Sequence, residues 1–96
     1  MISLVLAGTL VSMPGAHAYR VGVRGTAGTS LVVAAQAPPG WTAAFCSPRI
    51  CAVSHVPITI AAAGTSYVEL HLYPASSSKH GIVVVTAQSG VLRLRI

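Results

Sequence analysis

Tyr67-Val68-Glu69-Leu70-His71-Leu72-Tyr73 alternates strictly between aliphatic residues and residues that carry a polar group. Successive side chains of a β-strand point to opposite faces. We therefore expect Val68, Leu70 and Leu72 to face a core, and the other four residues to face solvent. One buried and one solvated face are typical of a strand in an antiparallel sheet. This stretch predicts an antiparallel β protein.

The composition of the surrounding chain agrees with this prediction. Residues 19–96 contain 11 Val, 5 Ile and 6 Thr, against 5 Leu, 1 Glu and 1 Lys. β-branched side chains lose rotamer freedom in helices and pack well on pleated sheets. Turn signals recur at short intervals and separate about seven expected strands: Arg20 to Arg24, Ser30 to Ala37, Thr42 to Cys46, Pro57 to Ala61, Tyr67 to Tyr73, Ile82 to Gln88 and Val91 to Ile96. Short strands with regular turns predict an antiparallel β-sandwich.

Two of these strands carry additional information. The run Ile82-Val83-Val84-Val85 is apolar on both faces, so we expect it inside a sheet or beneath a partner. Arg93 and Arg95 are expected on the outer face of the last strand, and Arg20 and Arg24 on the first. Cationic side chains on edge strands guard against strand-to-strand aggregation, so both strands are expected to border an edge.

The first 18 residues have the pattern of a signal peptide. An uncharged apolar run from Ile2 to Met13 is followed by Pro14-Gly15 and then by the small residues of Ala16-His17-Ala18. A helix needs about 20 residues to span a bilayer, and this run is shorter, so no transmembrane segment is expected. We predict a cleaved signal peptide over residues 1–18 and one domain over residues 19–96. The alternative is that Ser3 to Val11 is a β-strand of a longer parent protein.

Cys46 and Cys51 are the only cysteines. In an exported chain they are expected to form a disulfide that closes the loop from Ser47 to Ile50. A redox site is disfavoured because it normally has closer cysteines beside a helix N-terminus. A metal site that adds His55 to the two cysteines lacks an obvious fourth ligand. We therefore predict a disulfide, no metal and no cofactor.

A longer series of residues resembles a known family. Pro38-Pro39-Gly40-Trp41 opens a strand, Gly64-Thr65-Ser66 precedes another that ends at Pro74, and Gly81-Ile82-Val83-Val84-Val85 begins a third. This order resembles bacterial extracellular Ig-like accessory domains, including the NPCBM-associated domain of α-galactosidase-type proteins. The resemblance covers residues 37–87 and implies an Ig-like fold in one module of a secreted protein. It implies no specific activity, because the shared positions belong to the core and the turns.

The ionisable residues do not predict catalysis. Hydrolysis of glycosides generally needs two carboxylates, and Glu69 is the single acidic residue of the chain. No G-x-S-x-G motif accompanies the serines, which lie in expected turns. Glycine-rich segments precede expected strands rather than helix N-termini, so they do not predict phosphate binding. We predict that the chain is not an enzyme.

Binding is the function that the outward residues support. Tyr67, Glu69, His71 and Tyr73 are expected on one outer face, where aromatic rings offer a surface for a sugar or a protein. A surface metal site from Glu69 and His71 is a competing interpretation, as is a purely structural polar face.

The formal net charge of +5 would suggest nucleic acid in a cytosolic protein, but export removes that partner. We predict a secreted or periplasmic structural or binding module whose partner is an envelope polysaccharide or a larger secreted protein. The alternatives are a C-terminal fragment of a larger secreted protein, and a module that binds carbohydrate or an anionic polymer.

Overall fold

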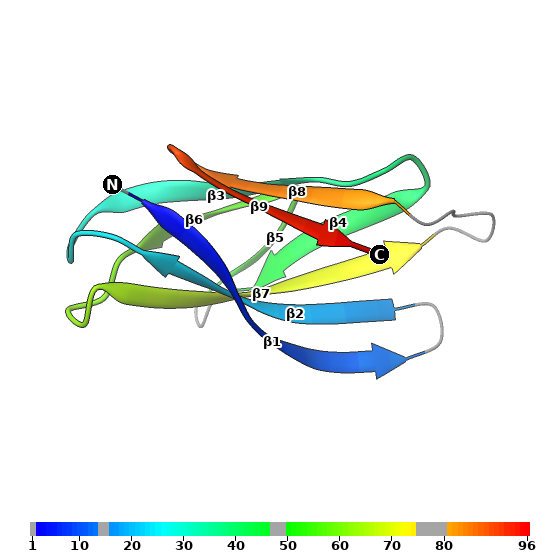
Figure 1. The fold of residues 1–96 in the computed structure, drawn as a ribbon, viewed down its shortest axis with the longest axis horizontal. Coiled ribbons are helices and arrows are strands. Elements are labelled where there is room, and N and C mark those ends of the chain that lie inside the picture. Colours follow the sequence, from blue (N-terminus) through cyan, green and yellow to red (C-terminus); the bar gives the residue numbers. More distant parts are fainter. Residues whose placement is uncertain (1, 14–15, 47–49, 75–80) are drawn as a thin grey trace.

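The computed structural model describes residues 2–13, 16–46, 50–74 and 81–96. These residues form strands and turns without a helix. The strands make two antiparallel sheets that pack face to face (Figure 1). The prediction of an all-β sandwich is therefore confirmed.

Each sheet joins strands that are distant in sequence. The order in the five-stranded sheet is β1 (Ser3–Met13), β2 (Ala16–Arg24), β7 (Thr65–Pro74), β4 (Trp41–Cys46) and β5 (Cys51–Val53). The order in the four-stranded sheet is β6 (His55–Thr59), β3 (Ser30–Gln36), β8 (Ile82–Ala87) and β9 (Gly90–Arg95).

This topology is Ig-like. The order β1-β2-β7-β4 corresponds to strands A, B, E and D of the constant-type immunoglobulin fold, and β3-β8-β9 corresponds to C, F and G. β5 and β6 add one strand to each sheet. The described residues thus contain nine strands rather than the expected seven, because β1 and the short β5 were not counted as strands.

β1 comes from the segment that resembles a signal peptide. It pairs with β2 from Ser3 opposite Arg24 to Met13 opposite Ala16, with two shifts in register. Ile2 and Leu4 are 5% and 8% exposed and lie in the core. The alternative interpretation was that Ser3 to Val11 is a strand of a longer parent protein; the full chain has a strand over Ser3–Met13, and the longer parent stays a prediction. Cleavage after Ala18 stays a prediction, and it would leave β2 as the edge of the sheet.

The core lies between the sheets and follows the alternation of the strands. On β7, Val68, Leu70 and Leu72 are at most 1% exposed, as their pattern predicts. They belong to one core cluster that contains buried side chains from both sheets. Other side chains that are less than 2% exposed are Val21, Val23, Val33, Phe45, Val56, Ile60, Val83, Val85 and Ala87.

A tight turn directs β4 into this core. The N–H of Trp41 donates to the carbonyl of Pro38 at 3.1 Å, and Gly40 has a φ of +87°. A positive φ at the third turn position after Pro at the second defines a type II turn, which favours glycine. β4 then places Phe45 fully inside, while Trp41 is partly buried against the core. Trp41 and Phe45, four residues apart on β4, thus share its inner face.

The disulfide joins β4 and β5. Cys46 lies directly opposite Cys51 in the strand pair, and their Cα atoms are 4.0 Å apart. The predicted bond is confirmed, whereas Ser47 to Arg49 of the expected loop lie outside the described residues. Both cysteines are bonded to each other, so the alternative site with His55 does not form.

β8 is an interior strand, as expected from its apolar run, because it lies between β3 and β9. β9 ends its sheet, so Arg93 and Arg95 lie on an edge strand. The prediction that Arg20 and Arg24 lie on an edge strand was wrong. Their strand, β2, is paired on both sides because β1 covers the edge that it was expected to leave open.

The burial of two isoleucines predicts that they contribute very differently to the free energy of unfolding. Ile60 is 1% exposed and Ile82 is 51% exposed. We expect Ile60→Ala to lower the free energy of unfolding by about 2 to 5 kcal/mol, because it removes buried methyl groups and leaves a cavity. The matched Ile82→Ala is expected to change it by about 0.5 kcal/mol. Urea unfolding followed by circular dichroism measures both, and equal losses would contradict the assignment of the core.

The disulfide closes a short loop, so its contribution is expected to be modest. The double variant Cys46→Ser, Cys51→Ser should lose about 2 kcal/mol of unfolding free energy according to the chain-entropy model. It should keep the β-sheet circular dichroism spectrum and a cooperative transition. A reductant should destabilise the wild type and leave the double variant unchanged. Loss of cooperative folding in the variant would show that the disulfide is needed for the whole fold.

Candidate functional site

β7 places the candidate residues on the outer face of the five-stranded sheet. Its core-facing residues alternate with Tyr67, Glu69, His71 and Tyr73, which we name the β7 outer row. Tyr67 and Tyr73 are 53% and 49% exposed. β7 lies between β2 and β4, so neighbours from both strands flank the row. The structure thus brings together all four residues that the sequence singled out for binding.

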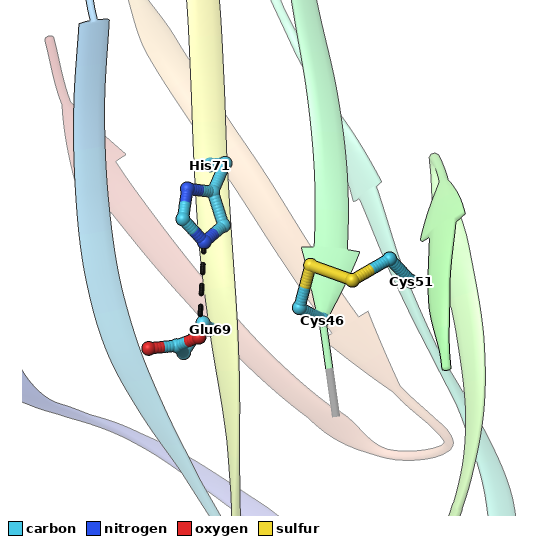
Figure 2. Close-up of a disulfide and its surroundings, with 4 residues drawn as sticks. All are labelled: Cys46, Cys51, Glu69 and His71. Atoms are coloured by element: carbon cyan, nitrogen blue, oxygen red, sulfur yellow. Dashed lines mark ion pairs between the residues drawn. A yellow bond between two sulfur atoms is a disulfide. The ribbon is translucent and has the colours of Figure 1, made fainter. Parts of the chain in front are cut away.

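Side-chain interactions link Glu69, His71 and Tyr73 in the C-terminal half of the row. His71 Nε2 lies 3.8 Å from Glu69 Oε2 (Figure 2). The ring of His71 also stacks on Tyr73, with centroids 6.4 Å apart and planes that differ by 11°. Two nearly parallel rings therefore lie close to a carboxylate on this face.

β2 contributes residues that sequence reasoning did not include in the row. Arg20 lies directly opposite Glu69, and its guanidinium carbon is 6.0 Å from the centroid of the Tyr67 ring. Gly22 lies opposite Tyr67. A β-carbon at Gly22 would lie 2.9 Å from Cγ2 of Val5 and 3.4 Å from Cε1 of Tyr67. The missing side chain at Gly22 therefore leaves room for Val5 and the Tyr67 ring.

β4 provides the other flank. Cys46 lies opposite Glu69, so the disulfide borders the row on the side away from Arg20 (Figure 2). Thr42 and Ala44 lie opposite Tyr73 and His71. Because these side chains are small, the rings of the row rise above their neighbours on this side.

A groove of about 930 Å³ begins beside Tyr67. It runs between the start of β7 and the edge strand β6, and Tyr67 belongs to both the groove and the row. The Ser66 hydroxyl closes one part of its wall by donating to the Thr59 carbonyl at 3.0 Å and accepting from the Ala61 N–H at 2.8 Å. The remaining lining residues are Ser30, Leu31, Val32, Ile50, Pro57, Ile58 and Thr65.

A second aromatic cluster lies at the other end of the molecule. His17 is 6.5 Å from Tyr19 and 5.6 Å from Trp41, measured between ring centroids. Tyr19 and Trp41 are partly buried against the core. His17 belongs to the predicted signal peptide, whereas in the full chain it packs with residues of the domain.

The chemical groups of the row suit non-covalent recognition. Aromatic rings provide stacking surface, Glu69 accepts hydrogen bonds and Arg20 donates them. Among the described residues, no group of three or more His, Cys, Asp and Glu side chains is placed to hold a metal ion. Within the same part of the chain, no helix has the length and apolar character needed to cross a membrane.

Sequence reasoning missed Arg20, Gly22 and the groove. The alternation within one strand shows which residues share a face, but it does not show which residues of another strand lie beside them. The sequence carried no signal that aligns Gly22 with Tyr67.

Comparison of the chain with known protein families, curated proteins and solved structures gives no match.

Proposed function

We propose that the chain is an exported, non-catalytic Ig-like module that binds an elongated polar polymer through the β7 outer row. The observation that carries this proposal is the alignment of Tyr67, His71 and Tyr73 along one exposed strand face. The two tyrosines are six positions apart in the sequence, which corresponds to a span of about 20 Å in a strand. That span suits several units of a polysaccharide better than one small molecule.

The charges on this face favour a carbohydrate or an anionic polymer. Glu69 and Arg20 lie opposite each other between the two tyrosines and offer an acceptor and several donors for hydroxyl groups. The formal net charge of +5 adds attraction for an anionic chain. An envelope polysaccharide combines these properties and is the partner that we propose.

Export is supported by the disulfide. Structural disulfides persist in oxidising compartments and are rare in the cytosol. Cys46 and Cys51 form such a bond on the outer face of the sheet. A secreted or periplasmic location accounts for it.

The alternative is that the chain forms the C-terminal part of a larger secreted protein. β1 is the observation that favours it, because Ile2 and Leu4 pack in the core as part of strand A. A strand that completes the sandwich is not expected to be removed as a signal peptide. A continuous reading frame upstream of Met1 would support this alternative.

The binding proposal predicts a specific effect of the two tyrosines. We expect Tyr67→Ala, Tyr73→Ala to weaken retention on immobilised peptidoglycan, chitin or alginate by on the order of tenfold, because each aromatic contact contributes about 1 kcal/mol. The double variant is expected to unfold at the same urea concentration as the wild type. Pull-down assays measure the retention.

The matched control for this experiment keeps the rings. Tyr67→Phe, Tyr73→Phe should retain most of the affinity if stacking is the main contact. Equal retention of the alanine variant and the wild type would exclude the β7 outer row as the binding face. Failure of the wild type to bind any of the three polymers would contradict the proposed ligand class.

Export predicts the intact mass of the protein recovered outside the cytoplasm. We expect a mass two hydrogens below that of the dithiol form, and a shift on reduction and alkylation, because of the disulfide. A chain that begins at Tyr19 would establish cleavage of residues 1–18. A chain that keeps β1 would support the larger parent protein. Recovery only from the cytoplasm with two free thiols would contradict export.

A further inference from the structure

The four-stranded sheet has an apolar outer face, on the opposite side of the sandwich from the β7 outer row. Val32 and Ile82 are each 51% exposed, and Val91 is 48% exposed. Ala34 and Val84, which are half-buried, lie on the same side of the sheet. We name these five residues, together with Arg93 and Arg95, the β3-β8-β9 face.

The strand register makes this face continuous. Thr86 on β8 lies opposite Ala34 on one side and Val91 on the other. Val84 lies opposite Arg93, and Ile82 lies opposite Arg95. Gln36 lies opposite Val84, so Thr86 and Gln36 lie among the aliphatic side chains, which neighbour one another diagonally across the three strands. Both arginines lie along the β9 border of this region.

An exposed face of this composition differs from an ordinary solvated sheet. The outer face of an antiparallel sheet is normally polar, and contiguous apolar patches on a surface mark interaction sites. β-branched side chains on a pleated sheet also pack well against another protein element. The face thus has the character of one half of an interface.

The charges on the face determine what complements it. Arg93 and Arg95 are exposed, and Glu69, the single acidic side chain of the sequence, lies on the outer face of the other sheet. A complementary surface must provide acidic groups at the border of an apolar strip. Residues two apart on a strand are separated by about 7 Å, a spacing that carboxylates on one face of a strand or a helix turn match.

A second copy of the chain does not meet this requirement. Two copies that stack these faces bring together arginines with no acidic partner. A contact between this face and the β7 outer row of another copy offers one carboxylate, Glu69, and places Arg20 beside Arg93 and Arg95. Like charges at an interface oppose association.

The dimensions of the face favour a single element of a partner. Six residues of β8 at about 3.3 Å each and three strands at about 4.8 Å spacing give a face of roughly 20 Å by 14 Å. A standard interface buries about 800 Å² per partner, which is well above this area. One amphipathic helix or strand covers it.

A lipid surface is less suitable than a protein element. Residues that anchor proteins at membrane interfaces are commonly Trp and Tyr. The tyrosines of the outer row belong to the other sheet, and Trp41 is partly buried. The β3-β8-β9 face presents short Val, Ala and Ile side chains on a pleated surface instead.

From this geometry we infer that the β3-β8-β9 face docks an amphipathic segment of a partner protein, with aliphatic residues along its centre and Asp or Glu beside Arg93 and Arg95. This interaction is separate from polymer binding by the β7 outer row, so each proposal can be tested without the other.

Selection from a phage-displayed library of random peptides against the full-length wild-type chain tests the inference. We expect the enriched peptides to combine Val, Ile or Leu with Asp or Glu. Their affinity should fall about tenfold for Arg93→Glu, Arg95→Glu, since reversed charges repel the acidic groups. It should also fall for Ile82→Ser, Val91→Ser, which makes the centre of the face polar.

The matched control reverses two arginines on the other sheet. Arg20→Glu, Arg24→Glu changes the net charge by the same amount and should leave peptide affinity unchanged. Urea unfolding of each variant identifies any loss that comes from the fold. Equal weakening by both charge reversals would overturn the inference, because it would show attraction to net charge alone.

Three other outcomes would also overturn it. One is the absence of peptides that distinguish the wild type from the variants of this face. Another is binding of these residues to phosphatidylglycerol vesicles in place of peptides, which would assign the face to a lipid surface. The third is a dimer in sedimentation that Ile82→Ser, Val91→Ser dissociates, which would assign it to a second copy.

Discussion

The structure depends on the alternation of β7, a strand that is paired along both edges within the five-stranded sheet. Val68, Leu70 and Leu72 fill the space between the sheets, and their neighbours in the chain face outward. A slip of one residue would exchange these faces, burying Glu69 and exposing three aliphatic side chains. Burial of an unpaired carboxylate is costly, so the same alternation that builds the core also determines the composition of the outer row.

Most of the sandwich could be predicted from such local patterns, but strand A could not. The segment from Ile2 to Met13 is uncharged and mostly apolar, and a composition of this kind serves equally as the central part of a signal peptide or as a strand packed in a core. The distinction lies in contacts with residues that are distant in the sequence. Leu4 packs in the core, and an ideal β-carbon at Gly90 would lie 3.1 Å from the Ile2 carbonyl oxygen. Local sequence does not encode those contacts. The short β5 was missed for a related reason, since it is held by pairing with β4 rather than by a periodic pattern of its own.

In the candidate site, too, the residues within one strand could be predicted from its alternation, whereas the residues contributed by a neighbouring strand could not. The four residues of the β7 outer row follow directly from the alternation. Arg20 and Gly22 reach the row only through the register between β2 and β7, which also decides that the Tyr67 ring has space beside Gly22. The register depends on every residue along both strands and on the turns at their ends, so it was not available from the sequence of either strand.

The two outer faces of the sandwich differ in a way that supports two separate contacts. The β7 outer row combines aromatic rings, Glu69 and the neighbouring Arg20, so it already pairs opposite charges and suits a polar ligand with many hydroxyl groups. The β3-β8-β9 face combines exposed aliphatic side chains with Arg93 and Arg95 and contains no acidic side chain. Because the packed sheets hold these faces on opposite sides of one core, a ligand on one does not block a partner on the other. The two proposed contacts therefore need no conformational change to form together.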